Sequence, residues 1–173
     1  LYAVLLGREE QAEGCFDDQV RKLLPVMNQE NTGKTAAFFY ISSNGYVNVR
    51  KSGDYVAEMI ALAGGTYVPQ GLAGNENALS TMNMQMESFY AAARDADYII
   101  YNSTIDGKLD NLSQLLEKSS LLADFKAVKE GNVWCTEKSL FQETMGLGDM
   151  ILDIHRILTE EEPEGLRYMH RLR

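Results

Sequence analysis

Apolar and polar positions alternate along the chain in blocks of two kinds. Short apolar runs bounded by turn residues, such as "TAAFFYIS" and "DYIIYN", predict buried strands. Longer segments, in which apolar residues recur every three or four positions, predict amphipathic helices. The strands are expected over 35–42, 66–68, 97–102 and 132–136, with a short extended piece at 80–83. The helices are expected over 1–28, 54–63, 84–96, 147–158 and 166–173, with one or two short helices within 111–131.

The helix expected over 54–63 ends at two adjacent glycines, Gly64 and Gly65. One of them can take the left-handed conformation that closes a helix, after which the segment 66–68 can extend directly. At the other end of this helix, Asp54 is expected at the N-cap or in the first turn, where a carboxylate meets free N–H groups.

Strands that alternate with helices predict an α/β fold, here a Rossmann-like three-layer arrangement with a mainly parallel sheet flanked by helices. Ligands of such folds bind beyond the carboxyl ends of the strands. Three polar loops follow predicted strands, at 43–53, 103–110 and 137–146. We therefore expect these loops to line one edge of the sheet; a further loop is expected over 69–79.

The three loops carry aromatic, hydroxyl and cationic side chains, a mixture that suits an organic ligand with anionic groups. The candidate ligand-binding residues are Tyr46, Arg50, Ser103, Thr104, Lys138 and Phe141. Arg50 would meet a carboxylate or phosphate, and Tyr46 and Phe141 would pack on an apolar face. The alternative for Arg50 is a solvated loop cation with no partner.

The charge balance argues against nucleic acid and anionic membranes as partners. The 173 residues include 25 acidic and 16 basic side chains, a formal net charge of −9, whereas nucleic-acid binders usually present a basic face. No apolar run reaches the roughly eighteen residues of a membrane-spanning helix.

We find no catalytic signature and expect no metal ligand and no cofactor. Cys15 and Cys135 lie far apart with no Cys/His cluster, so a structural zinc site is not expected, and whether they form a disulfide stays open. His155 and His170 are expected to pack or face water. The methionines of "STMNMQMESF" could bind a soft metal, but we expect them in the core or in the wall of a cleft.

Several segments in order resemble a known family. "VRKSGDYVAEMIALAGGTYV", "MQMESFYAAARDADYIIYNSTIDG" and "LLADFKAVKEGNVWCTEKSLFQETMGLGDMILDIHRIL" are similar to the C-terminal lobe of the periplasmic-binding-protein class that serves ABC importers of iron–siderophores, haem and cobalamin. "LYAVLLGREEQAEGCFDDQV" is similar to the end of the long helix that joins the two lobes of these receptors. The resemblance thus implies a connecting helix over 1–30 and a C-terminal lobe over 31–173, without the N-terminal lobe.

The resemblance implies an extracytoplasmic solute-binding component that performs no reaction. It would hold a metal chelate (a ferric siderophore, haem or cobalamin) in a cleft between lobes and deliver it to the ABC permease subunits. The metal would stay within the chelator. Alignment of "SGDYVAEMIALAGG" places the acidic residues of the family that dock on the permease nearest Asp54 and Glu58. Which chelate is bound, and whether the receptor is periplasmic or lipid-anchored, stays open.

A second interpretation is the α/β domain of a cofactor-handling, nitrogenase-like enzyme, because such folds share this architecture. An enzyme would need convergent titratable groups or cysteine ligands at the strand ends. Cys135 is the only thiol near such an end. A structural or scaffolding role is a third interpretation.

Overall fold

The structure is a computed structural model that describes residues 2–71, 80–143 and 146–173. The strands are β1 (Thr35–Ile41), β2 (Val47–Arg50), β3 (Thr66–Val68), β4 (Thr81–Met84), β5 (Tyr98–Tyr101), β6 (Val133–Thr136) and β7 (Met169–Arg171). The helices are α1 (Tyr2–Leu6), α2 (Glu9–Met27), α3 (Tyr55–Leu62), α4 (Met86–Ala93), α5 (Ser103–Asp106), α6 (Leu112–Lys118), the 3-10 helix η1 (Ser120–Asp124), α7 (Lys126–Glu130) and α8 (Leu147–Thr159).

In the described ranges, seven strands form one sheet: six follow the order β4-β2-β1-β5-β6-β7, and β3 lies off this path and pairs with β1. β3 pairs with the first half of β1 and β2 with its second half, both on the side opposite β5. β3, β1, β5 and β6 are parallel, whereas β2 and β7 run antiparallel to their neighbours β1 and β6. The predicted mainly parallel α/β sheet is confirmed.

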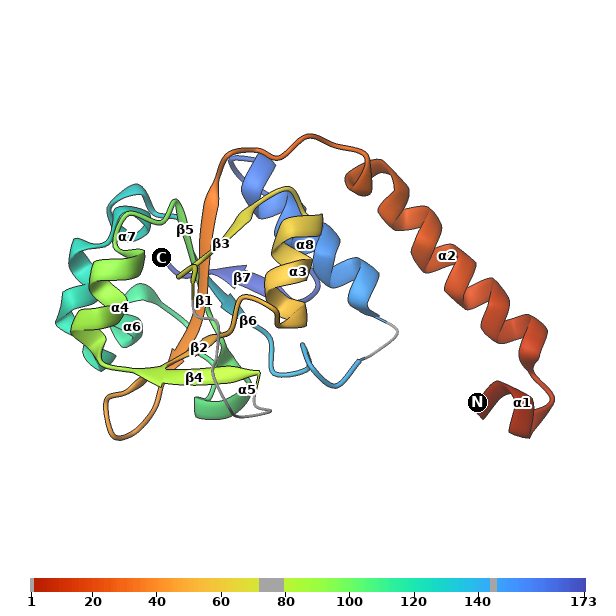
Figure 1. The fold of residues 1–173 in the computed structure, drawn as a ribbon, viewed down its shortest axis with the longest axis horizontal. Coiled ribbons are helices and arrows are strands. Elements are labelled where there is room, and N and C mark those ends of the chain that lie inside the picture. Colours follow the sequence, from red (N-terminus) through yellow and green to blue (C-terminus); the bar gives the residue numbers. More distant parts are fainter. Residues whose placement is uncertain (1, 72–79, 144–145) are drawn as a thin grey trace.

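Helices cover both faces of the sheet, which gives three layers (Figure 1). α3 and α8 cover one face, and α4, α6, η1 and α7 cover the other. Each face of the sheet has its own hydrophobic core, and successive residues of β1 point into opposite cores. Phe38 packs among residues of α3 and α8, whereas Phe39 packs against Phe89 on the other face. A strand buried on both faces reads as a continuous apolar run, which is why the sequence located β1 correctly.

The predicted N-terminal helix divides at Gly7 into α1 and α2, and α2 extends away from the sheet (Figure 1). In the part of α2 that lies away from the sheet, Phe16 is 64% exposed, although this residue has the helical spacing of a core position. Nearer the sheet, α2 packs on α8, where Lys22 Nζ lies 2.8 Å from Asp149 Oδ1. No described helix is both long enough and apolar enough to span a bilayer.

The turn after α3 confirms the prediction for the two glycines. Gly64 has a φ of 88°, and its carbonyl accepts a hydrogen bond from Thr32 N at 2.7 Å. Gly65 is needed for space, because a Cβ there would lie 2.8 Å from Leu158 Cδ1. At the start of α3, Asp54 is the N-cap, and its Oδ1 accepts a hydrogen bond from Val56 N at 3.0 Å.

Two predictions of local structure were wrong. The segment 43–53, expected to be a loop, contains β2, whose Val47 and Val49 are fully buried. The segment 166–173, expected to be a helix, contains β7, which pairs with β6. In addition, the expected loop 103–110 begins with the short helix α5. Most of the loop expected over 69–79 lies outside the described residues.

Candidate functional site

The carboxyl ends of β1, β5 and β6 lie side by side, as predicted, and the segments after β5 and β6 are hydrogen-bonded to each other. Ser103 N donates to Thr136 Oγ1 at 3.0 Å, and Ser103 Oγ donates to the Thr136 carbonyl. Asn102 N donates to the carbonyl of Phe39 in β1 at 2.7 Å. We call this side of the molecule, where β1, β5 and β6 end, the carboxyl edge.

Arg50 is the last residue of the antiparallel strand β2, and its side chain lies among aromatic rings. Its guanidinium carbon lies 4.9 Å from the ring centre of Phe141, 5.8 Å from that of Tyr55 and 5.9 Å from that of Phe38. Arg50 Nη1 lies 3.6 Å from Asp54 Oδ2, and the Arg50 side chain is 13% exposed. We call these five residues the arginine–aromatic cluster; in it, Arg50 is a packed cation and not a solvated one.

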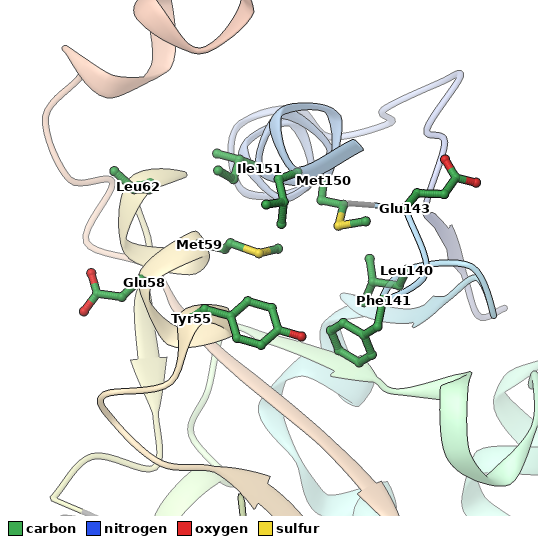
Figure 2. A pocket seen from close by; sticks show the side chains of 10 residues that line it. Tyr55, Glu58, Met59, Leu62, Leu140, Phe141, Glu143, Met150 and Ile151 are labelled. Carbon is green, nitrogen blue, oxygen red and sulfur yellow. The ribbon is translucent and has the colours of Figure 1, made fainter. Parts of the chain in front are cut away.

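A groove of about 440 Å³ adjoins this cluster, between α3, the first turns of α8 and the segment after β6 (Figure 2). Tyr55 and Phe141 form its aromatic end, with their ring centres 5.9 Å apart and their planes at 80°. The residues that line the groove are Tyr55, Glu58, Met59, Leu62, Leu140, Phe141, Glu143, Leu147, Met150 and Ile151. A concave, mostly apolar surface of this size is typical of a small-molecule site.

The carboxylate of Glu143 at the margin of the groove is already paired. Its Oε2 accepts hydrogen bonds from Arg167 Nη2 and from the Tyr168 hydroxyl, both at 2.7 Å. Burial, together with the hydrogen bond to Glu143, raises the pKa of Tyr168 to about 12. Burial also raises the pKa of Tyr55, although Arg50 opposes the shift. Both phenols therefore stay protonated at neutral pH.

The predicted ligand-binding residues have different surroundings. Arg50 and Phe141 meet in the arginine–aromatic cluster beside the groove. Tyr46 lies in the hairpin turn after β1 and is 38% exposed, and Lys138 is exposed. Ser103 is buried against Thr136.

Thr104 donates hydrogen bonds through its N and Oγ1 to Asn102 Oδ1, at 3.1 and 2.6 Å. The hydroxyls of Ser103 and Thr104 are thus used to shape the backbone after β5. The roles of these residues in ligand binding stay predictions.

Sequence reasoning missed Tyr55, Met59 and Met150 as groove residues. Tyr55 and Met59 have the helical spacing of core positions in α3, as Met150 has in α8, and Met59 and Met150 are indeed buried. Tyr55 is 47% exposed, however, at the first position of α3. The available signal was a large aromatic residue just after an N-cap, at the end of the predicted loop 43–53.

The two acidic residues proposed for permease docking differ in exposure. The Asp54 carboxylate is buried, caps α3 and faces Arg50. Glu58, one turn further along α3, is exposed and points away from the groove (Figure 2). The docking role of both residues stays a prediction.

Both cysteines are free: Cys15 is exposed and Cys135 is buried. Burial raises the pKa of the Cys135 thiol to about 11, so it stays protonated at neutral pH and is a poor nucleophile or metal ligand. In the part of the chain that the structure describes, no three His, Cys, Asp or Glu side chains are grouped as a metal site. The enzymatic interpretation thus gains no support from the thiol on which it depended.

No protein-family model matches the chain, and no curated protein matches its sequence. Solved structures do match its fold. The periplasmic haem-binding protein HutB of Vibrio cholerae superposes with a TM-score of 0.68 at 20% identity, covering 93% of this chain and 60% of HutB. A protein of the ABC-type Fe3+-hydroxamate transport system of Saccharomonospora viridis gives a TM-score of 0.70 at 16% identity, covering 91% and 52%.

The siderophore periplasmic binding protein from the fuscachelin gene cluster of Thermobifida fusca gives a TM-score of 0.66 at 19% identity, covering 91% of this chain and 56% of that protein. The chain thus spans between 52% and 60% of the length of these three proteins. Over that span the fold is shared, as the sequence resemblance implied. The chain has the fold of a lobe of the periplasmic substrate-binding proteins of ABC transporters.

Proposed function

We propose that the chain forms one lobe of the extracytoplasmic solute-binding component of an ABC importer. It binds a ferric siderophore, haem or a related metal chelate at the carboxyl edge and delivers it to the permease. The protein resides in the periplasm or is anchored on the outer face of the cytoplasmic membrane. The metal stays within its chelator, so the lobe needs no metal ligand of its own.

The observation that carries this proposal is the position of the groove. It lies beside the arginine–aromatic cluster, where the segment after β6 passes α3. Ligands of open α/β sheets bind outside the carboxyl ends of the strands. A chelate there would rest on Tyr55 and Phe141, and Arg50 would add a positive potential behind the two rings.

The resemblance implies that a second lobe closes over the chelate. This lobe alone would then supply one wall of the site, and it would still incur the full entropic cost of association. We therefore expect weak binding to the chain of 173 residues and tighter binding to a chain that carries both lobes.

The test is a titration of a two-lobe chain with ferric siderophores, haem and cobalamin, followed through tryptophan and tyrosine fluorescence. Saturable quenching by at least one of these chelates is expected. Arg50→Met, which keeps a long side chain against the rings, should weaken an anionic chelate, whereas Arg94→Ala, in an exposed position at the end of α4, should not. A failure of all chelates to change the fluorescence would contradict the proposal.

A further inference from the structure

We infer that the groove receives a flat aromatic ring of the chelator, so that the substrates of this protein are aryl-bearing metal chelates. This inference rests on the proposed function and narrows it. The groove has apolar walls, an aromatic end and room for a ring.

The walls offer a ligand almost nothing but apolar surface. Eight of the lining residues are apolar or aromatic, namely Tyr55, Met59, Leu62, Leu140, Phe141, Leu147, Met150 and Ile151. Among the lining side chains that the structure describes, the Tyr55 hydroxyl is the one conventional hydrogen-bond donor. A ligand carbonyl or hydroxamate oxygen buried here would lose its water and gain few partners, which is costly. An aromatic ring has no such cost.

The inner surface favours rings in particular. The edge-to-face pair of Tyr55 and Phe141 leaves an aromatic end on which a third ring can pack. The side chains of Met59 and Met150 reach from α3 and α8 into the space between them (Figure 2). Thioethers adapt to irregular shapes and make favourable contacts with ring edges. The groove, at about 440 Å³, also exceeds the roughly 150 Å³ apolar cavity that suffices for benzene.

Arg50 and Glu143, two of the charged side chains near the groove, are already paired. Arg50 lies behind the rings and opposite Asp54, and Glu143 is bonded to Arg167 and Tyr168. Glu58 is exposed and points away from the groove (Figure 2). Inside the groove a ring therefore gains more contacts than a charged group does, and the charge of the chelate is met outside it, on the side of Arg50.

A matched pair of neutral chelates tests this inference. Gallium(III) tris(benzohydroxamate) and gallium(III) tris(acetohydroxamate) have the same metal, charge and donor atoms, and differ in phenyl against methyl. Titration into the protein labelled with 13C at the methionine methyl groups should shift the resonances of Met59 and Met150 with the benzohydroxamate. Met169, which is buried near β6, serves as an internal reference. Burial of the larger apolar group predicts binding about tenfold tighter or more for the phenyl chelate.

Two variants locate the ring. Leu62→Trp would fill the groove from a position that is 40% exposed, and should weaken the benzohydroxamate complex to the affinity of the acetohydroxamate complex. Leu5→Trp, in a 72% exposed position on α1 far from the carboxyl edge (Figure 1), should leave both affinities unchanged.

Equal affinity for the two chelates would overturn the inference and leave the proposed function standing. Tighter binding of the phenyl chelate without shifts at Met59 and Met150 would also overturn it. Failure of both chelates, together with failure of haem and the siderophores in the fluorescence titration, would overturn the inference and the proposed function together.

Discussion

The guanidinium carbon of Arg50 lies 4.9 Å from the ring centre of Phe141, although one residue ends β2 and the other follows β6. The contact joins two strand-end segments that are separated by β1 and β5 in the sheet. Asp54 Oδ2 lies 3.6 Å from Nη1 of the same guanidinium, while Asp54 Oδ1 caps α3. The arginine–aromatic cluster thus fixes the position of the groove's aromatic end relative to α3.

Arg50→Ala should lower the free energy of unfolding by about 2 kcal/mol, because the cation–ring contacts are lost and the buried carboxylate of Asp54 is left unpaired. Urea unfolding measures the change. In the Asp54→Asn background the same substitution should cost less, since no buried charge is left behind. Arg94→Ala, whose exposed guanidinium lies 5.6 Å from one ring, is the control. A loss below about 0.5 kcal/mol for Arg50→Ala would show that the cluster contributes little to stability.

Gly64→Ala should destabilise the protein by about 1 to 2 kcal/mol, because the positive φ of 88° is unfavourable for a side chain with a Cβ. Gly64→Asn should cost less, since asparagine tolerates left-handed conformations better. Gly53→Ala is the control, because its Cβ would meet open space and its φ is not in the left-handed region. Thermal unfolding measures the difference. Equal midpoint temperatures for Gly64→Ala and Gly53→Ala would contradict this account of the turn.

Asp97 should make the stability pH-dependent at acid pH. Its Oδ2 accepts hydrogen bonds from Thr35 N and Oγ1, both at 2.8 Å, and its Oδ1 from Lys126 Nζ at 2.6 Å. Burial alone would raise the pKa of Asp97, but the hydrogen bonds from Lys126 and Thr35 outweigh it and hold the pKa below its ordinary value. The carboxylate therefore stabilises the fold fully above the unfolded-state pKa of about 3.9, and this contribution is lost as the pH falls through the lower folded-state value.

Asp97→Asn should accordingly cost about 1 to 2 kcal/mol at pH 7 and much less near pH 2. Unfolding by urea across this range measures the difference. Asp95→Asn, at a neighbouring carboxylate whose side chain is 87% exposed, should change the stability little at either pH. A cost for Asp97→Asn that stays constant with pH would refute the assignment.

Glu58→Arg tests permease docking separately from ligand binding. Glu58 lies at the margin of the groove, but its carboxylate is exposed and directed outward (Figure 2), so the reversed charge should leave the affinity for a neutral chelate within about twofold. Uptake by vesicles that contain the permease should fall about tenfold or more, because a like-charge contact replaces an attractive one. Full uptake by this variant would remove Glu58 from the proposed docking surface.

The elements that could be predicted from the sequence are those whose own apolar pattern shows which residues are buried. β1 and β5 are apolar on both faces, and α8 buries its regularly spaced apolar residues Met150, Ile151, Ile154, Ile157 and Leu158. β2 is hidden in the sequence by the polar residues of "SNGYVNVR". The signal for it is Asn44–Gly45, a pair that favours hairpin turns, followed by alternating apolar and polar residues. β7 was missed because its conformation is decided by pairing with β6, a contact between segments far apart in the chain.

The candidate site was predictable in part. Strand order and loop position brought Arg50 and Phe141 to the same edge, and the structure shows them in contact. The groove was not predictable, because helical spacing cannot tell whether Met59 faces a filled core or a gap between two helices. That distinction depends on where α8 lies against α3, which no local pattern encodes.

The position of a bound ferric chelate tests the central claim most directly. High-spin iron(III) broadens the NMR signals of nearby nuclei, so a titration of the 15N-labelled chain with ferric tris(benzohydroxamate) maps the site. We predict selective loss of the amide signals of Tyr46, Tyr55 and Phe141, with Lys34 and Asn132 at the opposite ends of β1 and β6 unaffected. Broadening centred on Lys34 and Asn132, or none at saturating chelate, would contradict a ligand site at the carboxyl edge.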